Sequence, residues 1–148
     1  MASFVLERIV PASPEAVFDL CLDVGLHLSS QSSRGERAVS GVTSGRLGEG
    51  DRVTWSARHF GIRFRMSSIV FDLDRPHRFR DRQTKGPFGA FRHTHEFEPV
   101  EGGTLMRDTI EFRSPFGPLG RLVDTLVMRR HLIGVITERN DAISAHFG

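Results

Sequence analysis

Four ionisable side chains near the middle of the sequence fall on positions that are otherwise apolar. His93 and His95 lie two residues apart in the segment Phe91–Phe97, and Asp81 and Asp108 occupy equivalent positions in the segments before and after it. Side chains of a β-strand alternate between the two faces of a sheet, so all four are predicted to share an inner face with apolar residues. Imidazole and carboxylate groups in such surroundings can transfer protons, coordinate a metal ion or bind the polar group of a ligand.

Glycine-containing turns join the three segments around this cluster into consecutive hairpins. The segments cover residues 79–85, 91–97 and 105–112, and the turns lie at 86–89 and 101–103. This pairing places His95 opposite Asp108, and Asp81 opposite or diagonal to His93. Directly opposed Cβ atoms lie ~5 Å apart in an antiparallel pair. We therefore expect His95 to hydrogen-bond to Asp108 and Asp81 to reach His93.

Four interpretations of this cluster are open at this point. Buried polar groups that pair with one another can fix the register of the strands, since buried charge is costly unless it is paired. The same groups can recognise the polar head of an otherwise apolar ligand. In a catalytic interpretation, His95 oriented by Asp108 is the general base of a cyclase or dehydratase. A metal site would combine His93, His95 and an aspartate, but its remaining ligands cannot be placed, so we predict no metal and no cofactor.

Composition limits the classes of function. The chain has 148 residues, with 20 Lys and Arg against 18 Asp and Glu. Its arginines alternate with threonine and glutamate instead of forming one basic patch, so we expect no nucleic-acid partner. No apolar run approaches the ~20 residues that span a bilayer, and no secretion signal is recognised, so we expect no stable membrane insertion. The single Cys21 suits a reducing, cytoplasmic location, and the oligomeric state is left open.

Hydrophobic periodicity predicts one strand, two short helices, six more strands and a long C-terminal helix. Ser3–Val10 alternates, and Ser13-Pro14-Glu15 is typical of a helix start with Ser13 as N-cap. A second short helix is expected at 26–30. The further strands are expected at 36–42, 51–59, 62–73, 79–85, 91–97 and 105–112, with a bulge near Ser67-Ser68.

The long helix is expected from Leu119 to Ala145. Its apolar or inward face would hold Leu119, Leu122, Leu126, Ile133, Ile136, Asn140 and Ile143. Because the strands after the short helices join by hairpins, the sheet should be antiparallel. The expected fold is α+β: one helix-grip domain over residues 1–148, with a curved seven-stranded sheet wrapped around the C-terminal helix.

Several stretches, together with this order of elements, resemble a known superfamily. They are Val10–Phe18, Asp81 with Gly86-Pro87-Phe88, His93–Phe97, Gly103–Asp108, Pro115–Gly120 and Arg139-Asn140. Together they resemble the START-like SRPBCC superfamily of birch-pollen-allergen-like, lipid-transport and polyketide cyclase/dehydrase-like proteins. The resemblance covers essentially the whole chain and points to a bacterial subgroup of mostly unassigned function. It implies a deep, largely apolar cavity between sheet and long helix, and it implies no shared cofactor and no catalytic residues.

We therefore predict binding or transport of a small hydrophobic molecule, such as a lipid, a quinone or an aromatic polyketide, without chemistry of its own. The alternative is a cyclase/dehydratase-like enzyme that uses His95 and Asp108. The predicted ligand-binding residues are Trp55, Phe64, Met66, Phe79, Asp81, Phe91, His93, His95, Met106, Asp108, Ile110 and Leu126.

Overall fold

The computed structural model describes residues 1–148, except for the side chain of Thr125. Its strands are β1 (Ala2–Val10), β2 (Arg37–Gly41), β3 (Arg52–His59), β4 (Ile62–Asp74), β5 (Arg78–Lys85), β6 (Ala90–Val100) and β7 (Gly103–Arg113). Its helices are α1 (Pro14–Cys21), α2 (Val24–Ser30), the 3-10 helix η1 (Ser32–Arg34), α3 (Gly117–Val123), the π-helix η2 (Asp124–Met128) and α4 (Arg129–Phe147).

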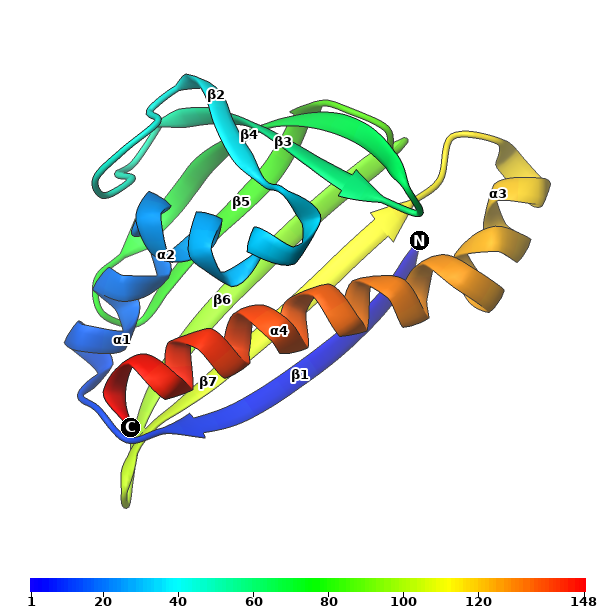
Figure 1. Ribbon diagram of the computed structural model, residues 1–148. Coiled ribbons are helices and arrows are strands. Elements are labelled where there is room, and N and C mark those ends of the chain that lie inside the picture. The colour runs from blue at the N-terminus through cyan, green and yellow to red at the C-terminus, as the bar shows by residue number, and fades with distance from the viewer.

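Within these residues the strands form one seven-stranded antiparallel sheet in the order β1-β7-β6-β5-β4-β3-β2. The sheet curves around α4, which crosses its concave side, while α1 and α2 lie beside the C-terminal end of α4 (Figure 1). The pairing register shifts between Ser67 and Ser68, which confirms the predicted bulge. The helix-grip fold predicted from the sequence is confirmed.

The first helix begins as its sequence predicts. The Ser13 side chain accepts a hydrogen bond from the Ala16 amide at 3.2 Å, and Pro14 is the first helical residue. Phe18 on the buried face of α1 packs edge-on against Phe79 of β5 and Phe97 of β6, with ring centroids 5.5 and 5.4 Å apart. This contact fixes α1 against one end of the curved sheet.

Two apolar clusters lie between the helices and the sheet, one under α1 and the end of α4 and the other under the first half of α4, and a polar layer separates them. Along β7, Met106 belongs to one cluster and Ile110 to the other, with Asp108 between them. Along α4, Ile143 and Ile136 belong to the same two clusters in the same order, and Arg139 and Asn140 are buried between them. The polar residues of strand and helix therefore meet at one level of the interior.

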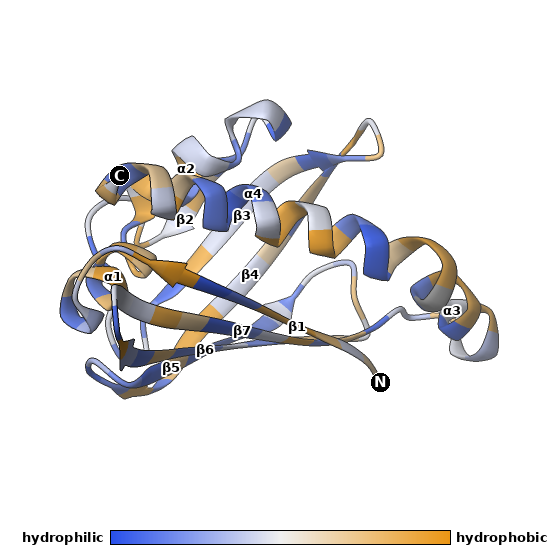
Figure 2. Cartoon of the chain, turned by 90° about the horizontal axis from the view of Figure 1, so that it is seen from below, coloured by the Kyte–Doolittle hydropathy of each residue, from blue (hydrophilic) through white to orange (hydrophobic). Residues whose placement is uncertain are grey.

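The N-terminal part of the long helix differs from the sequence prediction. Leu119, Leu122 and Leu126 were expected to face the sheet, but all three are mostly exposed. Two physical causes explain the difference. The π-helix η2 changes the angular spacing of the side chains, and α3 extends beyond the end of the sheet, as the views along two directions show (Figures 1 and 2). Of the helices described, none is long and apolar enough to cross a membrane.

Candidate functional site

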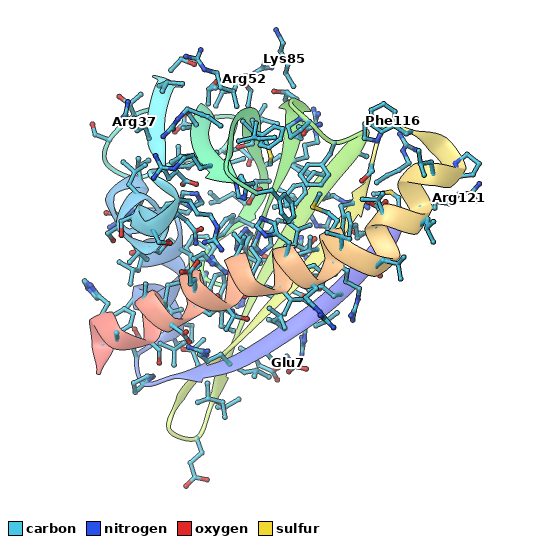
Figure 3. The ribbon with its side chains drawn as sticks, turned by 45° about the vertical axis from the view of Figure 1, so that its right-hand side comes forward. Glu7, Arg37, Arg52, Lys85, Phe116 and Arg121 are labelled. Atoms are coloured by element: carbon cyan, nitrogen blue, oxygen red, sulfur yellow. The ribbon has the colours of Figure 1, made fainter. Side chains whose placement is uncertain are left out.

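A cavity of about 610 Å³ lies between the concave face of the sheet and α4. Its walls include these predicted ligand-binding residues: Trp55, Phe64, Met66, Phe79, Asp81, Phe91, His93 and His95. Side chains from the sheet point toward α4 across this interior (Figure 3). The volume falls within the range of ~300–1,000 Å³ that is typical of pockets for small molecules. These residues are therefore placed where a ligand can touch them.

Four of the predicted ligand-binding residues do not line this cavity. Met106, Asp108 and Ile110 are fully buried on β7, where they pack against neighbouring residues of the interior. The alternation of a strand shows which side chains face inward, but α1 and α4 cover this part of the inner face. Leu126 lies in the π-helix with 65% of its surface exposed, and it does not line the cavity.

The strands pair as the turns predict, but the side chains bond diagonally. His95 lies opposite Asp108, and His93 lies opposite Asp81, which confirms the predicted register. The hydrogen bonds nevertheless join His93 Nε2 to Asp108 Oδ1 and His95 Nε2 to Asp81 Oδ2, each at 2.7 Å. His95 stacks on Phe79, its opposite neighbour on β5, with ring centroids 4.0 Å apart. This stacking directs the His95 ring along β5 toward Asp81, so the expected partners are exchanged.

Asp108 is the charged centre of the buried layer. Its Oδ1 accepts a hydrogen bond from the Arg139 guanidinium as well as the one from His93, and its Oδ2 accepts a bond from Asn140 Nδ2 at 3.1 Å. His95 Nδ1 is 3.6 Å from the same Oδ1. Both Arg139 and Asn140 come from α4, so this carboxylate ties the helix to β7. A buried charge with this many partners is typical of a structural ion pair.

The surroundings set the protonation states of the cluster. Burial lowers the pKa of His95 to about 4, helped by His93 and opposed by the hydrogen bond to Asp81. Burial alone would raise the pKa of both aspartates. At Asp108 the charge of Arg139 and the interaction with His93 outweigh the effect of burial and lower the pKa below its usual range. At Asp81 the interactions with His95 and His93 outweigh it and lower the pKa in the same way. At neutral pH we therefore expect two carboxylates, one guanidinium and a neutral His95 that donates Nε2–H to Asp81.

A metal ion would fit this cluster poorly. Asp81, His93 and His95 each offer a ligand atom, and these atoms lie within 4.8 Å of one another. The two imidazole rings are, however, stacked with centroids 3.6 Å apart and an interplanar angle of 19°, so their lone pairs run parallel and do not converge. Both Nε2 atoms are also engaged by carboxylates, and Arg139 Nη1 lies 3.5 Å from His95 Nδ1. The geometry favours hydrogen bonding over metal binding.

Other polar residues of the cavity come from elements far apart in the sequence. His27 of α2 stacks on Trp55 with centroids 4.0 Å apart, and its Nε2 lies 2.5 Å from Glu36 Oε1. His59 Nδ1 of β3 lies 2.8 Å from His131 Nε2 of α4. Burial lowers the pKa of His59 to about 4, and His131 adds to that effect. Sequence reasoning missed these contacts because no local spacing connects the helices with β3.

Asp81 is the charged group of the cluster that is open to the cavity. Its side chain is 23% exposed, whereas that of Asp108 is 0% exposed. Its Oδ2 accepts the bond from His95, and among the residues that the structure describes no hydrogen-bond partner is found for Oδ1. The arrangement can therefore accept a hydrogen bond from a molecule that lies in a mainly apolar cavity.

The chain is similar to known proteins over most or all of its length. The sequence matches the family described as polyketide cyclase / dehydrase and lipid transport over residues 1–148. An uncharacterised protein of Mycobacterium tuberculosis strain H37Rv is 32% identical over 127 residues, which cover 81% of this chain and 84% of that protein.

Two solved structures are similar in fold. The crystal structure of TTHA0849 from Thermus thermophilus matches with a TM-score of 0.76 and 22% identity, over 99% of this chain and 100% of that chain. The major latex-like protein 151 of Panax ginseng matches with a TM-score of 0.73 and 11% identity, over 99% and 97%. The family match over the whole chain confirms the resemblance seen in the sequence, and the chain belongs to the polyketide cyclase / dehydrase and lipid transport family.

Proposed function

We propose that this protein binds a small, largely apolar molecule in the cavity between sheet and α4, and that a donor group of the ligand bonds to Asp81. The observation that carries the proposal is a cavity of about 610 Å³ whose mainly apolar wall includes a partly exposed, partly unpartnered carboxylate. Pockets that combine apolar walls with few polar groups bind by burying apolar surface and select by hydrogen bonding.

The chemistry of Asp81 narrows the class of ligand. An ionised carboxylate accepts hydrogen bonds and repels other carboxylates. Among the predicted lipids, quinones and aromatic polyketides, the Asp81 carboxylate favours a molecule with a hydroxyl group, such as a phenolic polyketide or a lipid alcohol. A quinone, which offers carbonyl acceptors, and a free fatty acid fit this end of the cavity less well.

The properties of His95 support binding more than chemistry. A general base works best with a pKa near the operating pH, and the pKa of His95 is lowered to about 4. Its Nε2–H is donated to Asp81, and its Nδ1 faces Arg139. His95 is thus held as a neutral, hydrogen-bonded wall residue.

The test compares 2-naphthol, which has an apolar body and one hydroxyl group, with naphthalene, which lacks the hydroxyl. A hydrogen bond to a charged acceptor contributes ~1.5–3 kcal/mol, so wild type should bind 2-naphthol about tenfold or more tightly than naphthalene. Asp81→Asn should reduce this preference several-fold and change naphthalene affinity little. Competition with a fluorescent apolar probe measures both affinities.

Asp72→Asn is the matched control, because Asp72 pairs with Arg78 and Arg80 outside the cavity. It should leave both affinities at the wild-type level. The proposal fails if neither compound binds, or if Asp81→Asn and Asp72→Asn behave alike.

A second candidate is a cyclase- or dehydratase-like reaction, and the pair His93–Asp108 favours it. His93 lines the cavity, and its Nε2 is held by Asp108 at 2.7 Å, as a base oriented by a buried carboxylate would be. The pairing of His95 with Asp108 that the sequence suggested is replaced by this one. The enzyme hypothesis requires that His93→Gln abolish turnover of a polyketide substrate while 2-naphthol still binds, and it fails if wild type shows no turnover.

A further inference from the structure

The segment that joins β7 to α4 exposes an unusual amount of apolar surface. Phe116 is 72% exposed, Leu119 64%, Leu122 55% and Leu126 65%, and Val127 is 47% exposed. Single exposed apolar residues are common on soluble proteins, but a contiguous group of them marks a contact surface. These five residues, together with Arg121, Arg129 and Arg130, are called the α3 surface below.

The polarity of this segment is reversed relative to an ordinary surface helix. The side that contacts the body carries Gly120 and Asp124, which are both buried, while the leucines face outward. Asp124 accepts hydrogen bonds from the amide and the hydroxyl of Ser114. A β-carbon on Gly120 would lie 3.2 Å from the Ser114 carbonyl oxygen, so this side is closely packed. The segment is thus held in place through its polar side and leaves its apolar side uncovered.

The charge of the α3 surface has one sign. Between residues 113 and 137 the sequence has four arginines, at 113, 121, 129 and 130, and its one acidic residue is Asp124. Asp124 is 2% exposed, whereas the four arginines are exposed, so the charges at the surface of this segment are positive. Arg129 and Arg130 are exposed at the start of α4, one turn from Leu126. The apolar side chains of such a surface can be buried in an apolar environment, while its arginines attract negatively charged groups.

The α3 surface is continuous with the cavity. Phe116 and Leu119 of the α3 surface also line the cavity, and so do Val123 of α3 and Phe60 at the β3–β4 turn. Phe116 and Arg121 lie together at this end of the molecule, away from Arg37 and Arg52 (Figure 3). A molecule that enters or leaves the cavity at this end passes these side chains.

We propose that the α3 surface docks on an anionic lipid bilayer, with its leucines at the level of the head groups and Arg129 and Arg130 against lipid phosphates. The helix projects beyond the sheet (Figures 1 and 2), so it can enter a deformable bilayer, whereas a folded acidic partner would need a matching groove. Docking itself does not depend on the proposed function. A further step, in which the docked protein exchanges its ligand with the bilayer, does rest on the proposed function.

The test measures partition of the full chain onto sonicated phosphatidylcholine vesicles, with and without about 30% phosphatidylglycerol, by co-sedimentation. Wild type should bind the anionic vesicles more tightly. Arg129→Gln/Arg130→Gln should lower that partition roughly 25-fold, since each basic residue near an anionic surface contributes about fivefold. Leu122→Ser/Leu126→Ser should lower it at least ~tenfold through lost apolar burial.

Two matched controls change the same residue types elsewhere on the surface. Arg37→Gln/Arg52→Gln removes two exposed charges at the other end of the molecule, and Val5→Ser/Ile9→Ser removes two exposed apolar side chains of β1. Both should bind anionic vesicles like wild type, and all variants should bind 2-naphthol, which separates docking from the cavity function. The proposal is overturned if wild type does not bind anionic vesicles, or if control and test variants lose binding equally. It is also overturned if Leu122→Ser/Leu126→Ser keeps vesicle binding and instead loses a dimer or a contact with an acidic protein.

Discussion

Replacing Asp108 by asparagine is expected to lower the free energy of unfolding by ~3–5 kcal/mol, since the change leaves a buried cation without its partner. Asp108 is fully buried and bonds to His93, Arg139 and Asn140. Asparagine keeps the size of the side chain and an acceptor for His93, so the loss of charge beside Arg139 accounts for the effect. Urea denaturation followed by circular dichroism gives the two free energies.

Glu111→Gln on the same strand is the matched control. Glu111 pairs with Arg92 on the outer face at 3.1 Å, where both side chains are partly exposed. Surface pairs of this kind contribute ~0–1 kcal/mol, so the control should stay within that range. Equal effects of Asp108→Asn and Glu111→Gln would refute the view that the buried layer joins α4 to the sheet.

Filling the cavity is the second large expected effect. Ala57 of β3 lines the cavity wall, and phenylalanine there would place a ring in the space that a ligand needs. Forcing extra volume against a bound molecule costs ~1–3 kcal/mol, so Ala57→Phe should weaken 2-naphthol binding about 5- to 150-fold. Displacement of a fluorescent apolar probe measures the change.

The stability of the folded protein should change far less, because the new ring enters a cavity and not a packed core. Ala145→Phe makes the same substitution at an exposed position of α4 and should keep wild-type affinity. Binding that survives in Ala57→Phe would place the ligand outside this cavity.

The fold could be predicted because its signals are local. The alternation around His93 and His95, the turns near Gly86 and Gly102, and the Ser13 cap each depend on neighbours in the sequence. Strand register follows from the same turns, so the opposed residues were identified correctly.

Contacts between side chains were harder to predict. Which carboxylate each histidine bonds depends on ring stacking against Phe79, and this stacking has no sequence signature. Whether an inward residue lines the cavity depends on how closely α4 covers it, which separates Met106 and Ile110 from Phe91. A regular helical period places Leu126 on the inner face, but it lies in a π-helix and is exposed.

The central claim is that a small apolar molecule binds inside the cavity, and methyl NMR tests it most directly. The protein would be labelled at valine, leucine and isoleucine methyl groups and titrated with 2-naphthol. Signals of Val53, Leu132 and Ile136, which line the cavity, should shift and show contacts to the naphthol ring. Val5 and Ile9, exposed on β1, should not respond. Shifts confined to Val5 and Ile9, with the three cavity residues unchanged, would contradict the account.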